Sequence, residues 1–300
     1  MRTSAISFQS NLSVSTAALV VLAAIISIAP LKARAQFFTG PIASSTGGAG
    51  RAAADGSEAA FLNPASVVSL RKYYMSGIYG TSSHPVNGDQ STYGVSLADG
   101  TPENLFPASL SYIHRFVQGQ NDFTDVQQDL QVAVGASLLP RLGLGIAGHQ
   151  TTDLLNTGSR FTQTNMNVGL LFTPVDYVGL AATVTDVFTP SESVAQAQQV
   201  VPTYAIGGHL IIQNSFRFRL DFVRPDRGNE RTDVMSGIET YFTPSFAFRV
   251  GEMWKETLDQ NFFTAGLGYH GPNLSFDYSY QRDTRAGAGE THLIDLWVGF

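Results

Sequence analysis

Charged residues in the second half of the chain stand at spacings that would place them on one face of neighbouring strands. The stretch 216–222 reads Phe-Arg-Phe-Arg-Leu-Asp-Phe, so apolar and charged side chains alternate. Because successive side chains of a strand point to opposite faces, these three charges share one face. The same alternation in later segments adds to that face, and the candidate interior charges are Arg217, Arg219, Asp221, Glu239, Arg249, Asp277 and Asp295.

Two kinds of chemistry fit this set of charges. Buried charges need partners, so the first interpretation is a ladder of ion pairs that braces an interior or holds another segment against it. The planar guanidinium of arginine also binds carboxylates through two parallel hydrogen bonds. A site for an anionic head group, formed by Arg217, Arg219 and Arg249, is therefore the second interpretation.

Side chains for catalysis or metal binding are present, but their spacing does not bring them together. His149, His209 and His270 fall on separate predicted strands, which favours hydrogen bonding over metal binding. No Ser-His or Asp-His arrangement converges near a strand end. The chain has no cysteine, which excludes disulfides and thiolate chemistry. We expect no catalytic residue, no metal and no cofactor, and the protein is not predicted to be an enzyme.

The overall composition excludes several classes of protein. Only 14% of the residues are charged, and the mean hydropathy is near zero. A helical membrane protein needs spans of about 20 nearly uninterrupted apolar residues. A disordered chain would hold far fewer apolar residues. The net charge of −6 is not gathered in a run, and without a basic face no nucleic-acid partner is expected.

The first 35 residues have the form of a cleaved signal peptide. Arg2 supplies positive charge, residues 17–29 are apolar, and residues 33–35 have the small-x-small form that signal peptidase accepts. An apolar run of this length suits the core of a signal peptide and is too short to span a membrane. We expect cleavage after Ala35 and a mature chain that begins at Gln36. An uncleaved anchor helix is the alternative.

From Lys72 to Phe300 the chain repeats a unit of about ten alternating residues followed by a turn. Each unit has the length of a strand that crosses a bilayer at about 45°. About fourteen units are present, although twelve remains possible because the first two are weak. The predicted strands are 72–82, 91–98, 107–117, 128–138, 141–150, 162–172, 177–187, 202–212, 216–224, 232–242, 246–255, 261–270, 274–282 and 291–300.

The connections between these strands alternate between tight and long. Short turns at one end and longer loops at the other are typical of antiparallel β-barrels in the outer membrane of Gram-negative bacteria. We therefore predict an all-β transmembrane barrel over residues 72–300, surrounded by outer-membrane lipid. The tight turns are 139–141, 173–176, 213–215, 243–245 and 271–273, and the long polar loops are 118–128, 150–161, 188–201, 225–233 and 282–291.

The last predicted strand ends the chain on an aromatic residue. Its outward face consists of His292, Ile294, Leu296, Val298 and Phe300. A terminal aromatic preceded by alternating apolar residues resembles the signal that the barrel-insertion machinery of the outer membrane recognises. Phe300 is therefore the candidate insertion signal, and that machinery is an expected partner.

Residues 36–71 do not alternate and are rich in glycine, alanine and serine. Such a segment can form short helices and tight turns where the backbone approaches other groups closely. A barrel of about fourteen strands has a lumen too wide for its own side chains to fill. We predict that residues 36–71 fold into the lumen as a plug, and a periplasmic tail is the alternative. Glycines expected to face the lumen and leave room for it are Gly143, Gly145, Gly169, Gly179, Gly207, Gly266 and Gly268.

The stretch 47–65 resembles the hatch of the FadL-type outer-membrane transporters for long-chain fatty acids and other hydrophobic compounds. In that family a stretch rich in glycine and alanine precedes Asn-Pro-Ala and the first strand. The related PorV and PorQ proteins, which serve secretion, carry the same pattern. This chain is shorter, and its loops are short and polar where those transporters capture ligand with apolar loop helices. The motif positions are Gly47, Gly48, Gly50, Arg51, Asp55, Asn63, Pro64 and Ala65.

The resemblance implies two functions from different classes. The first is passage of hydrophobic small molecules, such as long-chain fatty acids, through a plugged barrel. The second is a PorV-like barrel without transport activity that docks a secretion or surface-assembly partner. An open porin is a third possibility and would require residues 36–71 to lie outside the lumen. A continuous apolar pocket between plug and wall would favour transport. A lumen sealed by ion pairs, together with a flat apolar patch on the periplasmic or extracellular side, would favour docking.

Overall fold

The computed structural model describes residues 38–300 apart from 54, 84–87, 119–123, 190–193, 195–198, 227–230, 258 and 285–288. The predicted signal peptide, residues 1–35, lies outside the described residues, and so does the expected mature start at Gln36. Cleavage after Ala35 therefore stays a prediction.

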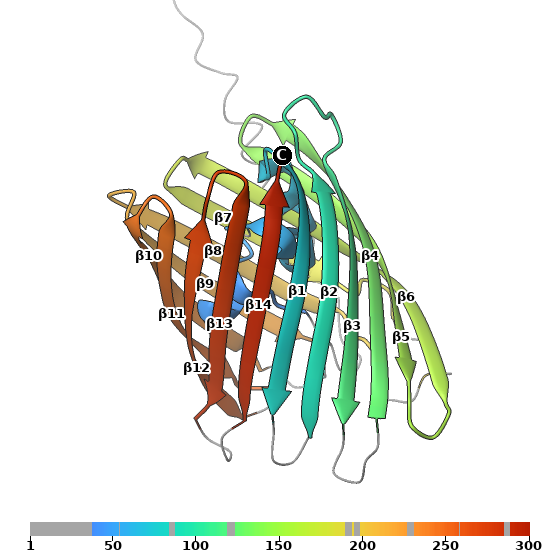
Figure 1. The fold of residues 1–300 in the computed structure, drawn as a ribbon. Helices are drawn as coiled ribbons and strands as arrows, with labels where there is room; N and C mark the ends of the chain where they lie inside the picture. The colour runs from blue at the N-terminus through green and yellow to red at the C-terminus, as the bar shows by residue number, and fades with distance from the viewer. Residues whose placement is uncertain are drawn as a thin grey trace, which may run out of the picture.

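Fourteen antiparallel strands close into a barrel in the described part of the chain (Figure 1). Each strand pairs with its neighbours in sequence, and β1 pairs with β14 to close the wall. The predicted all-β barrel is confirmed, with fourteen strands rather than twelve. The strands are β1 (Tyr73–Ser83), β2 (Asp89–Asp99), β3 (Ala108–Gln118), β4 (Thr124–Leu139), β5 (Leu142–Leu154), β6 (Arg160–Val175), β7 (Val178–Thr185), β8 (Thr203–Ile212), β9 (Phe216–Pro225), β10 (Asp233–Thr243), β11 (Phe246–Lys255), β12 (Gln260–His270), β13 (Leu274–Asp283) and β14 (Glu290–Gly299).

The connections separate the barrel into two ends, which we call the tight-turn end and the long-loop end. The tight-turn end carries the two-residue connections β4–β5, β6–β7 and β10–β11 together with the C-terminus. Two of the predicted long loops are wrong, since β4 begins at Thr124 and β5 continues to Leu154. The polar residues of those stretches belong to strands that extend farther than the apolar alternation. The tight-turn end also holds an eight-residue connection at 100–107 between β2 and β3.

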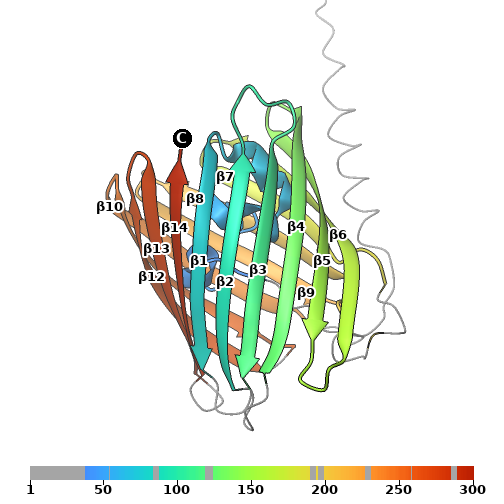
Figure 2. The same ribbon diagram turned by 45° about the vertical axis from the view of Figure 1, so that its right-hand side comes forward.

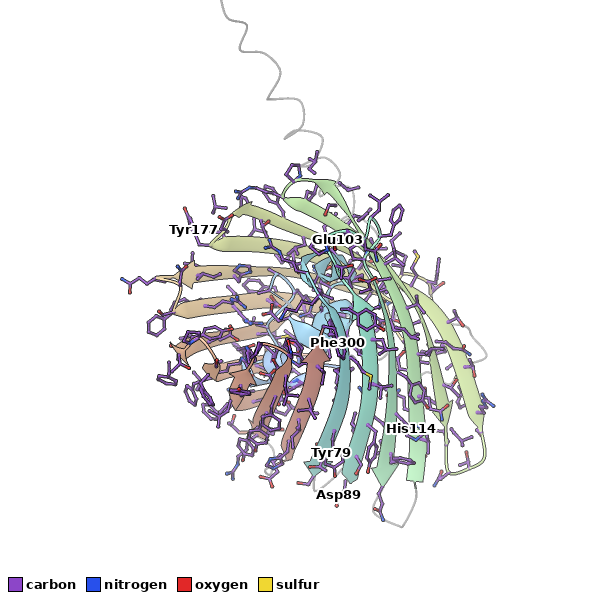
Figure 3. All side chains as sticks on the ribbon, turned by 45° about the horizontal axis from the view of Figure 1, so that its top comes forward. Tyr79, Asp89, Glu103, His114, Tyr177 and Phe300 are labelled. Atoms are coloured by element: carbon purple, nitrogen blue, oxygen red, sulfur yellow. The ribbon has the colours of Figure 1, made fainter. Side chains whose placement is uncertain are left out.

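The two faces of the wall have opposite chemistry. Apolar side chains such as Val132, Ile206 and Leu267 are exposed on the outside, whereas polar ones such as Gln131 and Thr264 are buried on the inside. A soluble barrel would place its apolar side chains inside, away from water. A barrel with an apolar exterior and a polar interior is the arrangement that suits a lipid surround. Side chains radiate from the whole wall in Figure 3, where Tyr177 and Phe300 lie toward the tight-turn end and Asp89 toward the other.

Residues 38–71, which we call the N-terminal segment, lie inside the barrel (Figures 1 and 2). The segment consists of short helical pieces joined by turns, as its composition predicts. They are α2 (Pro41–Ser45), η1 (Gly56–Glu58), α3 (Ala59–Leu62) and η2 (Pro64–Ser69). Nearly all of their side chains are buried, and they pack against inward-facing residues of the wall. Among the described residues, no helix is long and apolar enough to cross a membrane.

The C-terminal residue joins the two strands that close the barrel. The backbone N–H of Phe300 donates to the carbonyl of Tyr73, with an N···O distance of 2.9 Å, and the centroids of the two rings are 6.3 Å apart. The outward face of β14 contains Ile294, Leu296 and Val298, in agreement with the alternation, while Leu293 and Asp295 point inward and are buried. The Phe300 ring is therefore placed on the outer surface at the tight-turn end.

Candidate functional site

A row of three glycines on neighbouring strands forms the seat of the Asn-Pro-Ala motif. Gly135 on β4, Gly145 on β5 and Gly169 on β6 stand opposite one another in the strand register. A methyl group added at Gly145 would collide with the backbone of Pro64, and one added at Gly169 would collide with the side chain of Asn63. The wall lacks side chains at these positions because backbone and side-chain atoms of the N-terminal segment occupy that space.

Asn63 ties the seat together through its side chain. Its backbone is extended, at φ −155° and ψ 109°, as expected for the residue before Pro64. Its Oδ1 accepts from the N–H of Ala65 at 3.0 Å, and its Nδ2 donates to the carbonyls of Arg51 at 3.0 Å and Leu170 at 3.1 Å. One amide thus satisfies buried backbone groups on both the segment and the wall, which would otherwise be costly to leave unpaired.

A second close contact involves Gly47 and two facing glycines. Gly237 on β10 and Gly251 on β11 are register partners, and methyl groups there would collide with the backbone of Thr46 and Gly47. Gly47 has φ +68°, a conformation that side chains rarely adopt. Its N–H donates to Oγ1 of Thr264 at 2.9 Å. Position 47 therefore requires glycine both for its backbone conformation and for the close contacts around it.

The other two glycines of the motif do not lie against glycines of the wall. Gly48 faces the sulfur of Met235, and Gly50 lies against Leu62 and Ala43 of its own segment. A methyl group at Gly50 would come within 3.1–3.2 Å of those two side chains. The reason is that the segment folds back on itself here, so part of its tight packing is internal.

The interior charges of β9 to β13 form one connected cluster. Glu239 accepts from Arg249 at 2.6 Å and from Arg219 at 3.2 Å, and Arg217 lies 3.3 Å from its other oxygen. Arg249 also donates to Asp277 at 2.7 Å. Four of these five side chains are almost fully removed from solvent, the exception being Arg217. Each buried charge thus has a partner of opposite sign, which is the condition for tolerating it in an interior.

Charges of the N-terminal segment join this cluster from the lumen side. Arg51 pairs with Asp221 at 3.1 Å, and the backbone N–H of Arg51 donates to the same carboxylate at 3.0 Å. Asp55 accepts from Arg217 at 2.8 Å and lies 3.4 Å from Arg219. The structure therefore agrees with ion pairs that hold another segment against the wall. Two of the three arginines proposed for an anionic head group already contact Asp55.

Glu58 connects two parts of the N-terminal segment and has no cationic partner in contact. Its two carboxylate oxygens accept from the N–H of Ala43 at 2.8 and 3.1 Å. Complete burial raises the pKa of Glu58 to about 8, against the opposing attraction of Arg219 and Arg249. The neighbouring Ser57 hydroxyl donates to Asp295 on β14. Burial of Glu58 therefore favours the protonated carboxyl in the folded protein.

The three interior histidines lie apart and bind different partners. His149 lies 3.1 Å from Asp186, His209 lies 3.0 Å from the carbonyl of Ala52, and His270 lies 3.1 Å from Asp277. In the described part of the chain, no group of three or more His, Asp or Glu side chains could hold a metal ion. Each of the three histidines thus has a separate polar neighbour.

A cavity of about 690 Å³ opens at the long-loop end of the barrel. The N-terminal segment forms its floor, where the rings of Phe38 and Phe61 pack edge to face with centroids 5.1 Å apart. Met235, Met253 and Phe262 from β10, β11 and β12 line one wall. We call this space the vestibule. It is the volume in which the barrel could hold a small molecule.

The wall beside the vestibule is incomplete between β6 and β7. The ladder between these strands runs from residue 168 onward, so residues 160–167 of β6 have no partner on β7. One backbone hydrogen bond, from the N–H of Val187 to the carbonyl of Met166, and two asparagine side chains join β6 to the following loop there. Asn165 exchanges hydrogen bonds of 2.8 and 2.9 Å with the backbone of Phe188, and Asn167 accepts from the N–H of Asp186 at 2.9 Å. A short stretch of loop therefore closes this part of the wall.

Sequence reasoning missed Glu58 and the apolar wall of the vestibule. The second could have been found, because Met235 falls on the same face of its strand as Glu239 by simple alternation. An apolar side chain among polar inward positions is the signal. For Glu58 the sequence holds no comparable signal, since its burial depends on how the segment folds back.

Together these features define a class of protein: a lipid-facing β-barrel of the outer-membrane type with its N-terminal segment folded inside. Solved structures with the same fold include a hydrocarbon channel and a toluene transporter. The CymD monoaromatic hydrocarbon channel is 12% identical over 87% of this chain and 97% of that chain, with a TM-score of 0.70. The Ralstonia pickettii toluene transporter TbuX is 12% identical over 87% and 98%, with a TM-score of 0.67. A Pseudomonas aeruginosa FadL homologue is 11% identical over 89% and 99%, with a TM-score of 0.63.

The resemblance to FadL-type transporters that the sequence indicates is thus confirmed for the fold. At such low identities the likeness carries no residue roles. No protein-family model matches the sequence. No curated protein matches it either.

Proposed function

We propose that the protein is an outer-membrane channel that passes hydrophobic small molecules into or across the membrane. The observation that carries this proposal is the vestibule, a cavity open at the long-loop end with Phe38, Phe61, Met235, Met253 and Phe262 in its lining. In a porin for polar solutes the lumen is filled with water, and apolar side chains that face it would stay exposed to that water, which is unfavourable. An apolar molecule that enters would cover them.

The N-terminal segment acts as the plug of this channel. Its contacts with the glycine row, with Asp221 and with the cluster around Glu239 fix it to the wall on several sides of the lumen. Next to the vestibule, the described part of the wall has an edge without a regular ladder, at residues 160–167 of β6. There one backbone hydrogen bond and two asparagine side chains take the place of a full ladder. We infer that ligand leaves sideways at this edge.

The plug is tested by deleting residues 37–60 and comparing single-channel conductance in planar bilayers. The deletion should insert as a barrel and conduct ions, whereas the full chain should stay closed. Equal conductance in both proteins would show that the segment is no plug. Uptake is tested with radiolabelled toluene and radiolabelled oleate in cells with and without the protein, and accumulation that does not depend on the protein would refute transport.

The sideways exit is tested by a reversible lock. The N–H of Val187 donates to the carbonyl of Met166 at 3.0 Å, so cysteines at these two positions would join the loop to β6. The chain contains no other cysteine, which makes the bridge unambiguous. Uptake should stop in the oxidised protein and return on reduction. A matched bridge between the register partners Ile146 and Val168, in an intact ladder, should leave uptake unchanged.

Docking of a periplasmic partner is the second candidate function. The connection 100–107 at the tight-turn end exposes Leu105 and Phe106, at 76% and 57% of their surface. Asp99 orders this connection by accepting from Thr101 and Asn104. If docking is the function, changing Leu105 and Phe106 to serine should abolish it while the vestibule stays intact. Under the transport proposal, the same change leaves uptake unaffected.

A further inference from the structure

The vestibule has two walls of different chemistry, and they stand opposite one another. Met235, Met253 and Phe262 are partners in consecutive strand registers, so they form one continuous apolar row across β10, β11 and β12. In the closed order of strands, β4 is seven places from β11 in either direction. The strands β3, β4 and β5 therefore face the apolar row across the cavity.

The apolar row offers a surface for a hydrophobic body. The thioethers of Met235 and Met253 are polarisable and adapt to apolar or aromatic surfaces of varied shape. Both side chains pack with Ala205, Val223 and the half-buried Phe262, yet they also face the cavity. Gly48 and Arg51 cover part of the Met235 sulfur, and the rest of the row lines the cavity. An apolar occupant would remove that remaining surface from water and gain free energy in proportion to its area.

The opposite wall is polar and holds an excess of carboxylates. Arg115 donates to Gln127 at 2.7 Å rather than to a carboxylate, and Gln127 in turn donates to Asp153 at 2.9 Å. His149 lies between Asp129 and Asp186, at 3.7 and 3.1 Å.

Four carboxyl groups line this side of the vestibule, and the basic side chains beside them are Arg115 and His149. The four are Asp125, Asp129, Asp153 and Asp186. Lys255 lies across the cavity, beside the ring of Phe262 at 5.3 Å from its centroid. The polar wall therefore holds more acidic than basic side chains.

We propose that the vestibule binds amphiphiles with a cationic head, such as long-chain amines, in preference to carboxylates. The proposal rests on the transport function above and names the head group of the transported molecule. The apolar body lies on the row Met235–Met253–Phe262, and the ammonium faces Asp129 and Asp153. In a partly dehydrated cavity, charge attraction is far stronger than in bulk water, so the sign of the head group decides affinity. A carboxylate would meet repulsion at the same place.

Three probes of equal chain length separate head group from body: dodecylamine, dodecanol and dodecanoate at pH 7. The full-length protein is placed in lipid nanodiscs, and binding is measured by equilibrium dialysis against empty nanodiscs. Dodecylamine should bind at least tenfold more tightly than dodecanoate, with dodecanol between them. Equal affinity for the amine and the carboxylate would overturn the head-group inference and leave hydrophobic transport standing. No binding of any of the three would overturn both.

Variants then assign the two walls. The double change Asp129→Asn and Asp153→Asn should lower affinity for dodecylamine about tenfold and leave dodecanol unchanged. Asp176→Asn, in the exposed β6–β7 turn, is the matched control and should bind all probes as the parent does. Met253→Gln should weaken all three probes. Heat-modifiable gel mobility reports whether each barrel is folded, and an unchanged amine affinity in a folded double variant would refute the assignment.

Discussion

Gly145→Val is the sharpest test of how the N-terminal segment is held. Gly145 stands at the centre of the glycine row on β4, β5 and β6, and its missing side chain leaves room for the backbone of Pro64 and Ala65. Backbone cannot swing aside as a flexible side chain can. A valine at this position therefore forces η2 out of its seat instead of being absorbed locally.

The cost can be worked from the contacts that the seat contains. Displacing η2 breaks the hydrogen bonds from Asn63 to the carbonyls of Arg51 and Leu170, each worth ~1 kcal/mol. It also exposes Val67, which packs fully buried against alanines of the wall, at ~1.5–2 kcal/mol. The total is roughly 4 kcal/mol, which corresponds to about a thousandfold shift toward the undocked segment.

Planar-bilayer conductance and protease cleavage within residues 38–71 would both report undocking. Gly145→Val should conduct and be cleaved, whereas the parent should do neither. Gly148→Val on the same strand is the matched control, because a methyl group there meets no atom within 4 Å. If both variants behave like the parent, the segment is not held by the glycine row.

Three further predictions concern other contacts. Arg249→Met leaves Glu239 and Asp277 buried without their shared partner, so the free energy of unfolding should fall by ~3–5 kcal/mol. The barrel should then unfold at a lower temperature, measured by its heat-modifiable gel mobility. An unchanged unfolding temperature would contradict a stabilising role of the cluster. Because the pKa of Glu58 is raised to about 8, docking of the segment should be strongest below pH 4.5 and weaken as pH rises toward 8. Docking is measured as protection of residues 38–71 from protease, and in Glu58→Gln this protection should no longer change with pH. Deletion of Phe300 should lower the yield of inserted barrel, and a normal membrane yield would count against the insertion signal.

The strands were predictable because each one carries its own alternation of side chains, independent of its neighbours. A lipid-facing strand must alternate apolar and small or polar side chains, so each strand shows its position in its own sequence. The segment 246–255 agrees with β11 at both ends. The errors occur where the strands extend beyond the lipid-facing alternation, as at the start of β4. There both faces are polar, and the pattern that marks a strand is lost.

The contacts of the N-terminal segment were predictable only in part. The Asn-Pro pair fixes an extended residue and a turn locally, and the structure has both at Asn63. The pairing of Arg51 with Asp221, or of Glu58 with Ala43, depends on how the segment folds within the lumen. No spacing along the chain encodes such contacts. The same holds for the short ladder between β6 and β7, which follows from where β7 ends.

The composition of the segment and the composition of the inner wall both follow from one physical requirement, that buried backbone groups need hydrogen-bond partners. A segment of short helices inside a closed barrel brings backbone N–H and C=O groups into a space where few waters can reach them. The wall supplies their partners, as Thr264 does for Gly47 and Asp221 does for Gly50. Such hydrogen bonds need close approach, and close approach needs glycine on one or both sides. A polar lumen, glycines in register and a segment rich in small residues are therefore one feature of this barrel, seen from its two sides.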